Sequence, residues 1–219
     1  WENPAEYVAH ALENNQFSVY GQEIRPARPF DLAQDRPVAG SRKMLELLVR
    51  LREEEESLTP PGAFIPVLEH YNLMPALDRW VVRQVLDLYA RRRADAKDWG
   101  FPLCSVNLSA ATLGDAEFPG WVRQELLSRN IPADSLGFEI DLADAERAMG
   151  GARLLVKTLR ELGCPIALAG FGSSPVSFDA LKQLPVQYIK IEGNLVVNII
   201  RDPVALAKVS AINRVSHTI

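Results

Sequence analysis

The chain has 219 residues, of which 47% are hydrophobic and 24% charged, and its formal net charge is −4. This is enough apolar material for one sizeable core, and the acidic balance argues against a surface for duplex nucleic acid. No apolar run approaches the ~20 residues of a membrane span, and we see no signal peptide. Cys104 and Cys164 follow no metal or disulfide spacing, which predicts buried thiols in a reducing compartment. We therefore expect a cytoplasmic domain without membrane contact.

Short apolar strands and amphipathic helices alternate along most of the chain. Two polar segments interrupt this pattern. Residues 25–43 predict a long loop, and residues 52–62 predict a solvated connection. The expected strands are residues 17–24, 46–50, 102–109, 136–142, 165–172 and 186–193, and the expected helices are residues 1–15, 77–93, 118–130, 151–163, 177–184 and 204–217.

Repeated strand–helix units predict an α/β fold with a mostly parallel sheet and crossover helices. Two architectures satisfy this order: an open doubly wound sheet and a closed (β/α) barrel. No glycine-rich dinucleotide fingerprint follows the first strand, so the nucleotide-binding doubly wound fold loses its main support.

Polar side chains interrupt five of the expected strands, and we expect each to fall towards the C-terminal part of its strand. In a β/α barrel that end forms the mouth of the active site. One strand amide is usually a satisfied core group, and one strand lysine usually reaches solvent. Together they predict an oxygen-ligand shell of the kind that Mg²⁺ prefers, with Arg50 suited to a phosphate. The five residues are Gln22, Glu46, Asn107, Glu139 and Lys190.

Five ordered segments make the chain similar to the EAL domain family of cyclic-di-GMP phosphodiesterases and their inactive relatives. They are "ELLVRLR", "GAFIPVLEHYNLMPALDRWVV", "SVNLSA", "LGFEIDL" and "LPVQYIKIEG". The resemblance implies a modified TIM (β/α) barrel with an antiparallel first strand. It also implies a single domain over residues 1–219 that lacks its C-terminal strands.

The resemblance implies metal ligands at Glu46, Asn107 and Glu139 and an assisting Lys190. It also shows what is lost. The family's Asp-Asp-Phe-Gly reads here as Ala169-Gly170-Phe171-Gly172, and a further family acid corresponds to Leu142. Losing two anionic ligands lowers metal affinity, so we expect these residues to be vestigial, with no cofactor.

Ligand binding is a separate expectation. In relatives that bind cyclic-di-GMP without cleaving it, the contacts correspond here to Gln22, Leu48, Val49, Arg50 and Asp78. We therefore expect a cyclic-di-GMP receptor. Two alternatives stay open: a phosphodiesterase with residual Mg²⁺- or Mn²⁺-dependent activity, and a scaffold that binds no ligand. The family also implies a homodimer, formed near residues 170–178, or a partner signalling protein.

Overall fold

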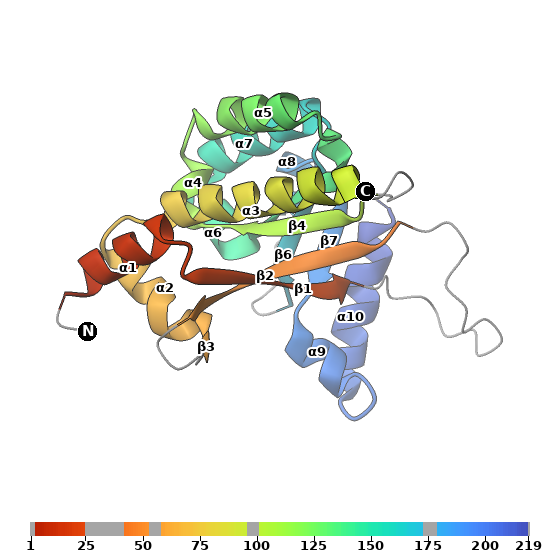
Figure 1. The fold of residues 1–219 in the computed structure, drawn as a ribbon. Helices are drawn as coiled ribbons and strands as arrows, with labels where there is room; N and C mark the ends of the chain where they lie inside the picture. Colours follow the sequence, from red (N-terminus) through yellow and green to blue (C-terminus); the bar gives the residue numbers. More distant parts are fainter. Residues whose placement is uncertain (1–2, 25–41, 53–57, 96–100, 173–178, 219) are drawn as a thin grey trace. The chain divides into compact units, whose positions relative to one another are not determined.

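The computed structural model describes residues 3–24, 42–52, 58–95, 101–172 and 179–218 (Figure 1). Contacts divide the chain into two compact units, and each is described by itself. The first unit contains residues 1–106 and 125–136, and the second contains residues 107–124 and 137–219.

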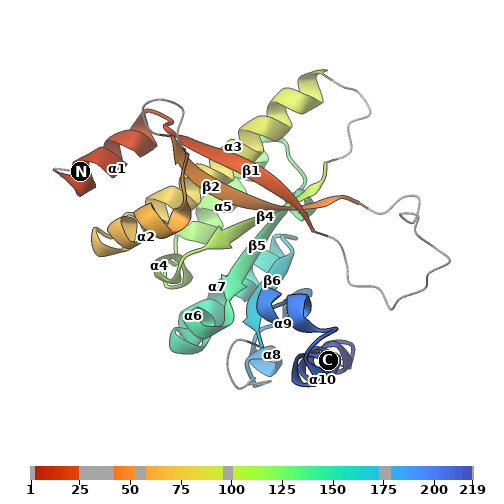
Figure 2. The same ribbon diagram turned by 90° about the horizontal axis from the view of Figure 1, so that it is seen from below.

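Strands of both directions meet in the first unit (Figure 2). Strand β1 is antiparallel to β2, with Phe17 opposite Leu51 and Ile24 opposite Met44. Strand β2 is parallel to β4, with Met44 opposite Leu103. The antiparallel first strand is thereby confirmed. The strands are β1 (Phe17–Ile24), β2 (Met44–Arg52), β3 (Leu58–Thr59) and β4 (Leu103–Leu108), whose last two residues belong to the second unit.

Aromatic side chains form the centre of the first unit. The ring centroid of Phe17 lies 5.4 Å from that of Phe64 and 5.7 Å from that of Trp80. These contacts join β1 to two helices, so the apolar positions of three elements share one core. The helices are α1 (Pro4–Glu13), α2 (Pro61–His70) and α3 (Met74–Asp95).

One prediction about the first unit is wrong. Helix α3 begins at Met74, not at residue 77, so Asp78 falls in its second turn and not beside its N-terminus. Within the expected connection, residues 52–62, the described part includes β3 and the start of α2, and Pro61 fits the first turn of that helix. Most of the expected loop, residues 25–41, lies outside the described residues.

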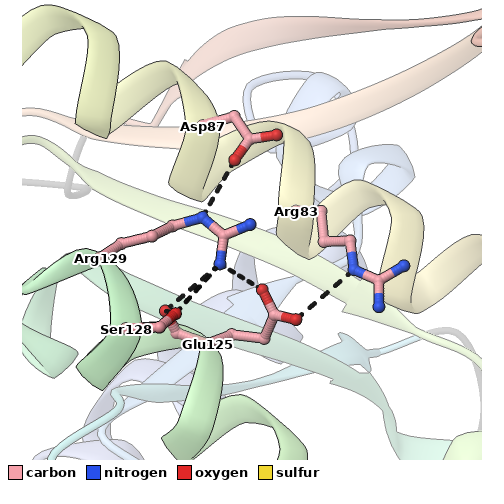
Figure 3. Close-up of polar contacts among 5 residues, drawn as sticks. All are labelled: Arg83, Asp87, Glu125, Ser128 and Arg129. Atoms are coloured by element: carbon pink, nitrogen blue, oxygen red, sulfur yellow. Dashed lines mark hydrogen bonds and ion pairs between the residues drawn. The ribbon is translucent and has the colours of Figure 1, made fainter.

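A charged network joins α3 to α5 (Phe118–Arg129) within the first unit (Figure 3). The Nε atom of Arg129 donates to Asp87 at 3.0 Å, and its Nη1 atom pairs with Glu125. Glu125 also pairs with Arg83 at 3.5 Å. Ion pairs between two arginines and two acidic residues therefore hold the end of α5 against the middle of α3.

Three parallel strands organise the second unit. Strand β5 (Leu136–Asp141) pairs with β6 (Ile166–Phe171), and β6 pairs with β7 (Tyr188–Ile191). All but the first residue of β5 belong to this unit. The α/β class with parallel strands is confirmed. The helices are α4 (Ala110–Leu113), the first part of α5, α6 (Leu142–Arg147), α7 (Met149–Glu161), α8 (Asp179–Gln183), α9 (Gly193–Asn198) and α10 (Pro203–Ser216).

Helix α7 packs an apolar face against strand β6. Its buried residues, Ala152, Leu155, Val156 and Leu159, follow the spacing of one helix face, and this helix contacts β6. Gly163, at φ +97°, follows the helix in the left-handed conformation typical of a helix end.

The sequence also makes predictions about the cysteines and about membrane spans. Cys104 and Cys164 are both buried and carry free thiols, as expected. None of the helices in the described ranges combines the length and the apolar character that crossing a membrane requires.

Candidate functional site

One face of the β1–β2 pair collects several of the predicted residues. Side chains alternate across a strand, so Glu46, Leu48 and Arg50 of β2 lie on one face. In the ladder Gln22 is opposite Glu46 and Tyr20 is opposite Leu48, and opposed residues project to the same side. We call Tyr20, Gln22, Glu46, Leu48 and Arg50 the β1–β2 face.

The other side of β2 is the packed one. Leu47 and Leu51 are buried there, and Val49 shares their side of the strand. The side chain of Val49 therefore does not lie on the β1–β2 face. Its carbonyl oxygen accepts a hydrogen bond from Nη1 of Arg50 at 2.8 Å. At Val49 it is therefore the main chain, and not the side chain, that lies beside the Arg50 guanidinium group.

Tyr20 belongs to the β1–β2 face and was missed by the sequence analysis. It is 47% exposed although it lies within a strand. An aromatic ring that stays open to solvent is a stacking surface for a planar ligand. The alternation of β1 was the available signal, because it places Tyr20 and Gln22 on the same side.

The prediction that each polar residue lies towards the end of its strand is wrong for Glu46. Strand β2 extends from Met44 to Arg52, so Glu46 is the third of its nine residues. It lies opposite Ser105 in the parallel β2–β4 pair. Asn107, near the end of β4, has an exposed side chain and does follow the prediction.

Asp78 is a buried carboxylate on α3. It is 3% exposed and lies beyond the first turn of the helix. A carboxylate this buried is costly unless it is partnered, and Asp78 does have an interaction partner.

In the second unit, Lys190 and Glu139 form an ion pair. Nζ of Lys190 lies 2.8 Å from Oε1 and 3.1 Å from Oε2 of Glu139. The Glu139 side chain is 6% exposed and that of Lys190 is 36% exposed. The ammonium group thus contacts both oxygens of a buried carboxylate and compensates its charge.

The neighbouring strand, β6, carries Ala169 and Gly170, where the resemblance implies an acid pair. Between Leu168 and Phe171 the β6–β7 register shifts, so Ala169 and Gly170 together face Lys190 alone. Two residues opposite one define a β-bulge, and Gly170 has the positive φ, +83°, that glycine adopts without strain.

These residues do not fit a pair of divalent metals. Ala169, Gly170 and Leu142 offer no side-chain oxygen, and Glu139 is already paired with Lys190. Over the described ranges, no group of three or more His, Cys, Asp or Glu side chains is arranged to hold a metal ion.

Comparison with known proteins decides the family. The family whose description is "EAL domain" matches residues 6–219. The chain belongs to the EAL domain family. It is 31% identical to the cyclic di-GMP phosphodiesterase PdeF of Escherichia coli over 195 residues, which are 88% of this chain and 24% of that protein. The chain thus spans about a quarter of the length of this relative.

Solved EAL structures share the fold. The FimX EAL domain of Pseudomonas aeruginosa bound to c-di-GMP has a TM-score of 0.83 and 28% identity, covering 99% of this chain and 81% of that one. The PaMucR phosphodiesterase in complex with c-di-GMP has a TM-score of 0.80 and 25% identity, covering 98% and 82%. The EAL resemblance and the TIM-barrel type of fold are confirmed. Residues 173–178 of the predicted dimer contact lie outside the described residues.

Proposed function

We propose that this EAL domain is a receptor that binds cyclic-di-GMP without hydrolysing it. The β1–β2 face carries the proposal, because it joins an amide, an apolar side chain, a guanidinium group and an aromatic ring. The FimX EAL domain, 28% identical to this chain, has been solved with c-di-GMP bound.

The chemistry of the face suits a dinucleotide of two guanines and two phosphates. Arg50 supplies a planar fork of N–H donors for a phosphate. Gln22 both donates and accepts hydrogen bonds, as the edge of a guanine does. Tyr20 and Leu48 offer apolar surface on which a base can stack. Asp78, as an acceptor-only carboxylate, suits the N–H donors of guanine.

The proposed lack of hydrolysis depends on the second unit. Without a metal to activate it, water keeps its pKa of about 15.7 and is a poor nucleophile at neutral pH. Ala169 and Gly170 provide no ligands for such a metal. Lys190 is paired with Glu139, and we propose that it supplies positive charge in place of a metal.

Isothermal titration with cyclic-di-GMP, with and without EDTA, tests the proposal. We expect micromolar or tighter binding, about −8 kcal/mol, that EDTA does not weaken. Tyr20→Ala should weaken binding by roughly 5- to 100-fold, the range of one lost base stack. Tyr71→Ala, which removes a tyrosine exposed to a similar extent outside the face, should leave affinity unchanged.

The same preparation distinguishes the alternatives. Chromatography after incubation with Mn²⁺ should show intact cyclic-di-GMP. Linear product that disappears with Glu46→Ala would instead identify a phosphodiesterase, the activity named for PdeF. If the protein is folded but binds no cyclic-di-GMP in the titration, the remaining alternative is a scaffold that binds no ligand.

We place this receptor in the cytoplasm, since two buried free thiols suit a reducing compartment. A receptor without catalysis must pass its signal through contacts. We therefore propose that it acts on a partner signalling protein or on a second copy of itself.

A further inference from the structure

We propose that Asp141 closes position 170 to side chains, so that one substitution cannot return a carboxylate there. The inference rests on the proposed function, in which the missing acids of β6 explain the absence of hydrolysis. It goes further, because it names Asp141, on the neighbouring strand β5, as a reason why position 170 cannot readily regain an acid.

Asp141 is held by the helix that follows it. As the N-cap of α6 it accepts hydrogen bonds through Oδ1 from the backbone N–H groups of Ala143, at 2.8 Å, and Asp144, at 3.2 Å. Such a cap satisfies amides that have no partner within the helix. Rotating this carboxylate away therefore costs the helix its cap.

The second carboxylate oxygen faces β6. Asp141 lies opposite Ala169 in the β5–β6 register, one residue before Gly170. A Cβ atom built on Gly170 would lie 3.0 Å from Oδ2 of Asp141. A contact of this length requires the exposed Asp141 carboxylate to move by a few tenths of an ångström, and the capping bonds of Oδ1 oppose that movement.

A carboxylate at position 170 would meet two obstacles. The first is the positive φ of Gly170, which strains any residue with a Cβ. The second is the Asp141 carboxylate, which adds steric contact and like-charge repulsion. The first obstacle belongs to the backbone, and only the second is removed by changing Asp141.

A double-mutant cycle separates the two obstacles. We compare Gly170→Asp in the native background with Gly170→Asp in an Asp141→Ser background, because serine is also a good N-cap. The melting temperature is the measurement, and no nucleotide is needed. Gly193→Asp is the matched control, since a Cβ there meets nothing within 4 Å.

We expect Gly170→Asp to lower the melting temperature by at least about 5 °C in the native background and by less than half as much in the Asp141→Ser background. The control should change it by less than about 2 °C. Equal losses in both backgrounds, or no loss in either, would overturn the proposal.

A metal titration gives a second readout. In the Ala169→Asp, Gly170→Asp variant, Mn²⁺ should leave the melting temperature unchanged, whereas adding Asp141→Ser should produce a Mn²⁺-dependent rise. A rise of the same size without Asp141→Ser would contradict the inference. Neither result depends on cyclic-di-GMP, so failure here is distinct from failure of the proposed receptor function.

Discussion

The β1–β2 face of the first unit and the β5–β7 strands of the second unit offer different chemical groups. The first keeps Gln22 and Arg50 on one side of a strand pair. The second has Ala169 and Gly170 at a bulge and a carboxylate paired with a lysine. Most groups that we propose to hold a dinucleotide thus lie on β1 and β2, where Glu46 is also an implied metal ligand, whereas Ala169 and Gly170 lie on β6.

Removing Arg50 is the most direct way to break this comparison. Arg50→Ala should weaken cyclic-di-GMP binding by roughly 10- to 100-fold, the value of charge-assisted hydrogen bonds to one phosphate. Isothermal titration measures it. Arg52→Ala is the control on the same strand, because its guanidinium group donates to the Asn15 carbonyl at 2.9 Å. If the native protein and Arg50→Ala bind cyclic-di-GMP with equal affinity, the β1–β2 face is not the binding site.

The Lys190–Glu139 pair tests the second unit. Lys190→Met should lower the free energy of unfolding by about 1–3 kcal/mol, since it leaves a buried carboxylate without its cation; the partial exposure of Lys190 keeps the loss below that of a fully buried pair. The double variant Lys190→Met, Glu139→Gln should recover part of the lost free energy of unfolding, as measured by urea denaturation. No recovery would mean that the two side chains are not coupled.

The α3–α5 network sharpens the comparison within the first unit. Arg129→Met should cost about 1–2 kcal/mol, measured by urea denaturation, because it breaks contacts with Asp87 and Glu125 together. Burial alone would lower the pKa of Arg129, but hydrogen bonds and charges from these acids outweigh it and raise the pKa. Arg147→Met, which breaks an exposed pair with Asp144, should cost less than about 0.5 kcal/mol.

The smallest effect concerns alkaline pH. Burial, followed by the neighbouring Cys104, raises the pKa of Tyr89, and burial raises the pKa of the Cys104 thiol. Both groups stay protonated in the folded chain while the unfolded chain releases protons above about pH 8.5–10. Stability should therefore be complete below that range and fall as pH rises through it.

Melting curves between pH 7 and 10.5 measure this loss. Tyr89→Phe should flatten the alkaline slope. It should also cost about 1 kcal/mol at neutral pH, because the hydroxyl lies 2.8 Å from the Pro102 carbonyl and 3.1 Å from the Ser135 carbonyl. An unchanged slope in Tyr89→Phe would mean that the fall has another source.

The sequence by itself determined the order of elements, the family and the identities of the residues at positions 169 and 170. Local pattern is sufficient for these features: alternating strands and helices predict parallel pairing, and the residues at 169 and 170 are read directly. It located most strands well, but it placed the start of α3 three residues late, since a helix end depends on backbone hydrogen bonds that the apolar pattern does not report.

Only the tertiary structure decided which residues share a side. The ladder register brought Tyr20 beside Leu48 and turned the Val49 side chain away from Arg50. The β5–β6 register brought Asp141 beside Gly170. Register and approach between strands arise from contacts distant in sequence, so no local pattern contains them.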